Sequence, residues 1–179
     1  MASQSIRIKS LEELHRYILL IKENSDKTIN NIKTLLASED SMAILHEFKF
    51  NQLGYEPIQG YRLNFIEQLN QMFSHIVVLK GAELLLKAYP DKEFILNMGT
   101  QGGFDIVSSD KKIVCECFST TSPISNNKIK QDADKLLKDN TSEKKYIIFY
   151  SKEVNATTLN NIIVKYKEIT FIRLDSINI

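Results

Sequence analysis

The chain has 179 residues, of which 43% are hydrophobic and 25% are charged, and its formal net charge is +1. These values are typical of one globular domain with a sizeable core, and a net charge this small means that any nucleic-acid-binding basic surface must be local. No apolar run approaches the roughly 18 residues of a membrane span, and no apolar signal-peptide region follows Met1–Ser10. We therefore expect a cytoplasmic protein that makes no membrane contacts.

The first 60 residues have a helical pattern. Ser10 and Glu13 form a capping box in front of an apolar stripe, which is typical of the start of an amphipathic helix. Two glycines and a proline within Leu53–Gly60 mark the clearest break in the chain. We expect a helical N-terminal subdomain over residues 1–60 and a separate core over residues 61–179. The helices expected before the break cover residues 10–24, 26–37 and about 39–50.

After this break, helical and strand patterns alternate. A helical pattern covers residues 61–89, its length favours a kink or break near Gly81, and Pro90 ends it. The resulting order, αβββαβαβ, predicts an α/β (α+β) fold with a mixed central sheet flanked by helices. The run 144–150 is continuously apolar after its lysines, as expected of a central strand. The strands are expected at 93–98, 104–107, 113–118, 144–150 and 169–174, and the last two helices at 128–138 and 157–166.

Two acidic residues interrupt the apolar strands of a predicted β-hairpin. Asp105 lies in the first strand, Glu116 lies in the second, and the polar turn Ser108–Lys111 connects them. A carboxylate in a sheet core costs several kcal/mol of folding free energy unless a cation or hydrogen bonds compensate it. Because two such carboxylates would also repel each other, a divalent metal ion held between them would relieve both problems.

The two cysteines, Cys115 and Cys117, are separated by one residue on the second strand of this hairpin. Both side chains therefore point to the same face, at a spacing that does not close a normal disulfide. No further cysteine is present to complete a zinc site, so we expect a buried pair of small thiols.

The order of elements and the position of these acids resemble the PD-(D/E)XK nuclease superfamily, which includes type II restriction endonucleases and Holliday-junction resolvases. The resemblance covers residues 80–174. Gly81-Ala82-Glu83 corresponds to the family's helical glutamate, and Gly103-Phe104-Asp105-Ile106 corresponds to its first motif aspartate. Val114-Cys115-Glu116-Cys117-Phe118 corresponds to its (D/E)-x-K strand.

This resemblance implies Mg²⁺-assisted hydrolysis of DNA phosphodiester bonds. Asp105, Glu116 and the main-chain carbonyl of Cys117 would be the metal ligands, and Glu83 would act through water or a second ion. Magnesium suits such a site because it needs few protein carboxylates and retains several waters. The ion would lower the pKa of a bound water and neutralise charge developing on the phosphate. Since restriction enzymes cut both strands of a symmetric site, the resemblance also implies a homodimer.

One position departs from the family pattern, because Phe118 stands where the motif lysine belongs. Either the cation has moved to Lys128 or Lys130 in the following helix, or to Lys112, or metal ions suffice without it. The remaining alternative is a catalytically inactive relative that binds nucleic acid without cutting it.

Each candidate residue also has a purely structural interpretation. Glu83 can be a solvated helix charge, Asp105 a local cap, and the lysines at 128, 130, 135 and 138 a solvated helix face. An unrelated α/β protein in which Glu116 pairs with a lysine is a third hypothesis, beside the nuclease and the inactive binding module.

Overall fold

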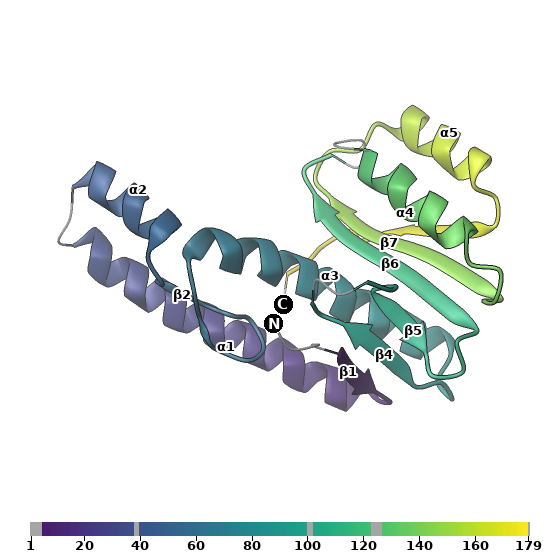
Figure 1. Ribbon diagram of the computed structural model, residues 1–179, viewed down its shortest axis with the longest axis horizontal. Coiled ribbons are helices and arrows are strands. Elements are labelled where there is room, and N and C mark those ends of the chain that lie inside the picture. The colour runs from purple at the N-terminus through teal and green to yellow at the C-terminus, as the bar shows by residue number, and fades with distance from the viewer. Residues whose placement is uncertain (1–4, 38–39, 100–101, 123–126, 179) are drawn as a thin grey trace. The chain divides into compact units, whose positions relative to one another are not determined.

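The computed structural model describes residues 5–37, 40–99, 102–122 and 127–178 (Figure 1). The helices in these ranges are α1 (Leu11–Leu36), α2 (Ser41–Phe50), α3 (Phe65–Ala88), α4 (Lys128–Leu137) and α5 (Ala156–Lys165). The strands are β1 (Ser5–Ile8), β2 (Gly54–Tyr55), β3 (Arg62–Leu63), β4 (Phe94–Asn97), β5 (Ile106–Ser108), β6 (Ile113–Thr120), β7 (Lys144–Ser151) and β8 (Ile169–Arg173).

Six of the strands form a mixed sheet in the order β1-β4-β5-β6-β7-β8. The pairs β1–β4, β4–β5 and β5–β6 are antiparallel, whereas the pairs β6–β7 and β7–β8 are parallel. A parallel pair needs a crossover connection, and α4 and α5 provide the two crossovers. The predicted α/β fold with a mixed central sheet and an αβββαβαβ order is therefore confirmed.

Two layers of helices cover this sheet. Helices α4 and α5 lie over one face, where Ile129, Ala133 and Leu136 of α4 pack against apolar residues of β6 and β7 (Figure 1). Residues 77–88 of α3 lie against the opposite face. A Cβ atom on Gly81 would lie only 3.1 Å from the Sγ atom of Cys117, so this glycine lets the helix approach the sheet closely. Helix α3 continues through Gly81, and the break expected there does not occur.

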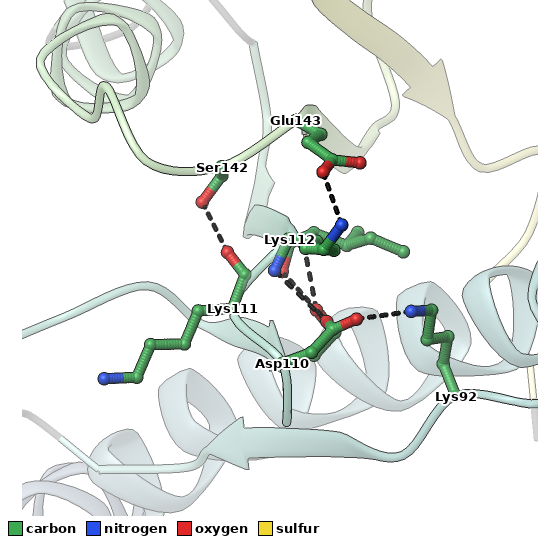
Figure 2. Close-up of polar contacts among 8 residues, drawn as sticks. Lys92, Asp110, Lys111, Lys112, Ser142 and Glu143 are labelled. Atoms are coloured by element: carbon green, nitrogen blue, oxygen red, sulfur yellow. Dashed lines mark hydrogen bonds and ion pairs between the residues drawn. The ribbon is translucent and has the colours of Figure 1, made fainter.

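A polar network fixes the turn between β5 and β6. The Nζ atom of Lys112 lies 2.6 Å from Oε1 of Glu143, and Ser142 Oγ donates a hydrogen bond to the carbonyl of Lys111 (Figure 2). Lys111 has a φ angle of 60°, in the left-handed region that tight turns use. A hydrogen bond from Lys92 holds the pKa of Asp110 in the same turn well below its usual range. These contacts thus stabilise the turn of the hairpin in which the two acids were predicted.

The chain divides into two compact units, one of residues 1–11 and 77–178 and the other of residues 12–76. This division differs from the expected boundary at residue 60. The first reason is that β1 pairs with β4 and so belongs to the sheet, with Arg7 forming an ion pair with Glu93. The second is that α3 begins in one unit and ends in the other.

The unit of residues 12–76 has a buried polar core. Gln68 accepts hydrogen bonds from the hydroxyl of Thr28 and from the backbone N–H of Tyr55, and Gln68 and Thr28 are both buried. Helix α1 runs unbroken where two helices were expected. Helix α2 begins after Asp40, whose carboxylate accepts from the N–H groups of Met42 and Ala43, and it lies within the range of about 39–50 where a helix was expected.

Within the described ranges, none of the helices is both long enough and apolar enough to span a bilayer.

Candidate active site

Glu116 lies at the centre of β6, on the face that α4 covers. Side chains alternate along a strand, so Glu116 shares its face with Val114 and Phe118, both of which belong to the apolar cluster beneath α4. Glu116 is only 2% exposed. An acid at this place in the sheet core requires compensating groups.

Asp105 lies beside Glu116. Strands β5 and β6 pair Ile106 with Cys115, and this antiparallel register, extended by one residue, places Asp105 opposite Glu116. The Oδ2 atom of Asp105 accepts a 2.7 Å hydrogen bond from the backbone N–H of Cys117. The structure therefore brings together the two acids that the sequence predicted to be neighbours.

The environment of the two acids raises the pKa of both. Burial and the nearby charge of Asp105 raise the pKa of Glu116 to about 8, and a lysine contact opposes this shift without cancelling it. Burial also raises the pKa of Asp105, against the opposing hydrogen bond from Cys117. Closely placed carboxyl groups with raised pKa values are typical of functional sites, although structural clusters also produce them.

Cys117 contributes its main chain to this side of β6. The N–H and C=O groups of one residue in a strand point the same way, so the Cys117 carbonyl faces the side on which Asp105 lies. Its thiol is buried on the other face, 3.6 Å from the Sγ atom of Cys115, and burial raises its pKa. Both cysteines are free thiols, as expected.

The cation next to Glu116 is Lys135 of α4. Its Nζ atom lies 2.6 Å from Oε1 of Glu116, donates a 2.5 Å hydrogen bond to the carbonyl of Gly103, and lies 5.3 Å from the centre of the Phe104 ring. From the sequence, Lys135 was expected only as one of several lysines on this helix. The missed signal is its seven-residue spacing from Lys128, which puts the two lysines on one helix face.

Lys128 also belongs to this cluster. Its Nζ atom lies 2.7 Å from Oδ1 of Asp132, one helical turn along α4. Burial lowers the pKa of Lys128, but the hydrogen bond to Asp132 and the charges of Glu116 and Asp105 raise it by more. Its ammonium therefore contacts Asp132, and its expected role as the replacement for the motif lysine stays a prediction.

Two of the other expected lysines lie elsewhere. Lys130 is exposed, and two residues correspond to about 200° around a helix, so it points away from the side of Lys128. Lys112 forms its ion pair with Glu143 at the hairpin turn (Figure 2). Neither takes the place of the motif lysine in this structure.

Phe118 is a core residue. It is 5% exposed, and its ring stacks on that of Phe149 with a centroid distance of 5.4 Å and an interplanar angle of 14°. The position that holds the lysine in the resembling family is therefore filled by packed aromatic side chains.

Glu83 is not part of the cluster around Glu116. Its carboxylate forms ion pairs with Lys80 and Lys87 of its own helix, at 3.6 and 2.6 Å. Gly81 faces the sheet, and Glu83 is about 200° further around the helix, so it points away from β6. The hydrogen bond from Lys87, although opposed by desolvation, lowers the pKa of Glu83, as in an ordinary helix ion pair.

Comparison of the chain with protein-family models, with curated proteins and with solved structures gives no match.

The donor set permits a small site for a hard cation. Within the described ranges, no three or more His, Cys, Asp or Glu side chains converge in a way that could hold a metal ion. Mg²⁺, however, is commonly bound through one or two carboxylates and several waters. Asp105, Glu116 and the Cys117 carbonyl supply that minimal set, and burial raises the pKa of both acids.

Proposed function

We propose that this protein is a Mg²⁺-dependent endonuclease that hydrolyses DNA phosphodiester bonds, similar to a restriction enzyme. The observation that carries the proposal is the placement of Asp105 opposite Glu116, with Lys135 2.6 Å from the Glu116 carboxylate. An acid pair can hold the ion of metal-assisted phosphodiester hydrolysis, and an adjacent lysine can stabilise the charge that develops on the phosphate.

Each group has a distinct role in this proposal. Asp105, Glu116 and the carbonyl of Cys117 would hold Mg²⁺, which when bound supplies an activated water and neutralises charge on the phosphate. The Lys135 ammonium, which is 43% exposed, is placed to pair with a phosphate oxygen or to orient the attacking water. Lys135 would thus perform the role of the motif lysine, whose position in the strand is occupied by Phe118.

The topology supports the same proposal. Glu116 lies on β6 and Asp105 immediately precedes β5, in a sheet in which a helix precedes three antiparallel strands and another helix leads to a parallel strand. This is the arrangement that the resemblance to PD-(D/E)XK nucleases predicted. Fold alone does not establish activity, so the proposal depends on the acid pair.

A catalytically inactive nucleic-acid-binding module is the second candidate. Phe118 in place of lysine favours it, as does the lack of a three-residue metal-holding group among the residues described. The Glu116–Lys135 contact by itself also fits an unrelated α/β protein with a structural ion pair. Such a pair does not require the second carboxylate of Asp105, whose charge raises the pKa of Glu116 and so opposes its ionisation.

A plasmid-nicking assay tests the proposal. We expect the protein to nick supercoiled DNA in Mg²⁺ or Mn²⁺ but not in EDTA, and Glu116→Gln to remove the activity. Glu143→Gln is the matched control, since that glutamate lies on the surface at the hairpin turn. DNA binding without nicking in either ion would favour the inactive module, and cutting of RNA but not DNA would change the substrate.

We further propose that the protein acts as a cytoplasmic homodimer. A chain with one such site needs two copies to cut both strands of a symmetric sequence. Met42, Leu45 and Phe50 of α2 are 72%, 60% and 63% exposed, which favours a protein-contacting surface there. Light scattering measures the oligomeric state, and a monomer that cuts both strands would contradict this part of the proposal.

A further inference from the structure

Asp132 is a third buried acid near the candidate site. Its side chain is only 5% exposed, and its Oδ1 atom accepts from Lys128 at 2.7 Å. Its Oδ2 atom is buried and has no hydrogen-bond partner within the described part of the chain. A buried carboxylate oxygen without a partner is costly, so its presence needs an explanation.

The ion pair with Lys128 does not account for this burial. Lys128 is 44% exposed and contacts a single oxygen of the buried carboxylate, so it compensates the lost hydration of Asp132 only in part. A surface carboxylate would form the same pair without losing its hydration. The pair also uses Oδ1 alone and leaves Oδ2 unexplained.

Helix geometry places Asp132 on the face of α4 that also carries Lys135. Lys128, Asp132 and Lys135 lie at positions i, i+4 and i+7 on one face of α4. Lys135, one turn beyond Asp132, reaches Glu116. The charge of Asp132 also acts on both Asp105 and Glu116, which confirms that it lies within electrostatic range of them.

Asp132 is nevertheless not a third direct ligand of the same ion, because the three acids do not converge as a metal-holding group. A hydrated Mg²⁺ or Mn²⁺ retains waters, and carboxylates outside the coordination sphere commonly accept hydrogen bonds from them. This is a use for a buried acceptor that does not reach the ion.

We propose that Asp132 is a positioning residue whose Oδ2 atom accepts a hydrogen bond from a water bound to the divalent cation held by Asp105 and Glu116. This inference depends on the proposed metal centre and assigns it a third carboxylate from α4. Asp132 would strengthen cation binding and fix the orientation of one bound water, and the proposed role of Lys135 toward the phosphate would be unchanged.

Mn²⁺ binding, measured by electron paramagnetic resonance of the free ion, tests this inference without an activity assay. The variants are Asp132→Asn, Asp132→Ser and Asp105→Asn. Asp134→Asn is the matched control, because that residue is on the same helix and its carboxylate accepts from Tyr166 instead. Lys128→Met separates a role in cation binding from a role in holding Lys128. Circular dichroism confirms that each variant is folded.

We expect Asp132→Asn and Asp132→Ser to weaken Mn²⁺ binding about 10- to 100-fold. Asp134→Asn binds as the wild type does, and Lys128→Met binds as tightly or more tightly because one competing positive charge is lost. Wild-type affinity in both Asp132 variants, with binding abolished in Asp105→Asn, would overturn the inference but leave the metal centre intact. Equal weakening by Lys128→Met and Asp132→Asn would also overturn it. An absence of Mn²⁺ binding by the wild type, or wild-type binding by Asp105→Asn, would overturn the metal centre itself.

Discussion

Lys135 reaches Glu116 from the helix that follows β6, with its Nζ atom 2.6 Å from Oε1 of the carboxyl group. The strand itself offers no cation at this point, because its next residue on the same face is Phe118. The cation that contacts Glu116 therefore comes from α4. The predictions below follow from this relationship and from the packing that surrounds it.

Replacing Lys135 with methionine should reduce DNA cleavage by about 100-fold or more, as is usual when one charge-stabilising donor is lost from a site. The measurement is the single-turnover nicking rate at saturating Mg²⁺. Lys130→Met is the control, since Lys130 is exposed on the other side of the same helix. Equal rates for Lys135→Met and wild type would show that Lys135 has no part in the chemistry.

Restoring the motif lysine should harm the protein. The Phe118→Lys variant removes a ring that stacks on Phe149 and places an ammonium in the core, so we expect a loss of about 3 kcal/mol or more in the free energy of unfolding. Chemical denaturation measures the loss, and Phe118→Leu should lose less. A stable Phe118→Lys variant with increased cleavage would contradict the assignment of the cation to Lys135.

In EDTA, Glu116 should make the folded state less stable as the pH rises from about 4.5 to about 8. Its pKa is raised from 4.5 to about 8 in the folded chain, chiefly by burial, so the folded state binds more protons than the unfolded state in this interval. The stabilising contribution of the protonated carboxyl is complete below pH 4.5 and is lost as the pH rises through about 8.

Denaturation of the wild type and of Glu116→Gln at several pH values checks this contribution. The difference between them isolates Glu116 from acids such as Asp139, whose pKa is lowered by hydrogen bonds from Ser142 and Thr141 that outweigh its desolvation. The difference should change by up to about 1.4 kcal/mol per pH unit. A difference that does not vary with pH would mean that the pKa of Glu116 is unperturbed.

Gly81→Leu should destabilise the protein by about 1–3 kcal/mol, the usual cost of overfilling a packed core. Even a Cβ atom at this position lies 3.1 Å from Cys117 Sγ and 3.2 Å from Ile106 Cδ1. Gly102→Ala is the matched control, because a Cβ atom there meets nothing within 4 Å. Thermal unfolding compares the two, and a neutral Gly81→Leu would show that α3 does not approach the sheet as described.

The sequence predicted the candidate site best where the apolar pattern of a single strand determines which side chains are buried. Glu116 lies between Val114 and Phe118 on one strand face, so it is buried if they are. The length of the hairpin turn then determines that Asp105 lies opposite it. The turn chemistry and the strand periodicity are local, so the register of β5 and β6 could be anticipated.

Other features depend on partners distant in the chain and left little local signal. Strand β1 has only four residues and is defined by pairing with β4, and residues 61–89 read as helix although β3 begins that segment. The choice among the lysines of α4 depended on the rotation of that helix over the sheet. Glu83 was expected at the site because its sequence context matched, but Gly81 sets the helix face that meets the sheet.

The most direct test of the account is an anomalous diffraction measurement on crystals grown with Mn²⁺. The account predicts an anomalous peak at ligand distance from carboxylate oxygens of both Asp105 and Glu116, with the Lys135 ammonium displaced from, or sharing, the Glu116 oxygen that it contacts here. Full Mn²⁺ occupancy elsewhere, with no peak between these two acids and Lys135 still against Glu116, would contradict it.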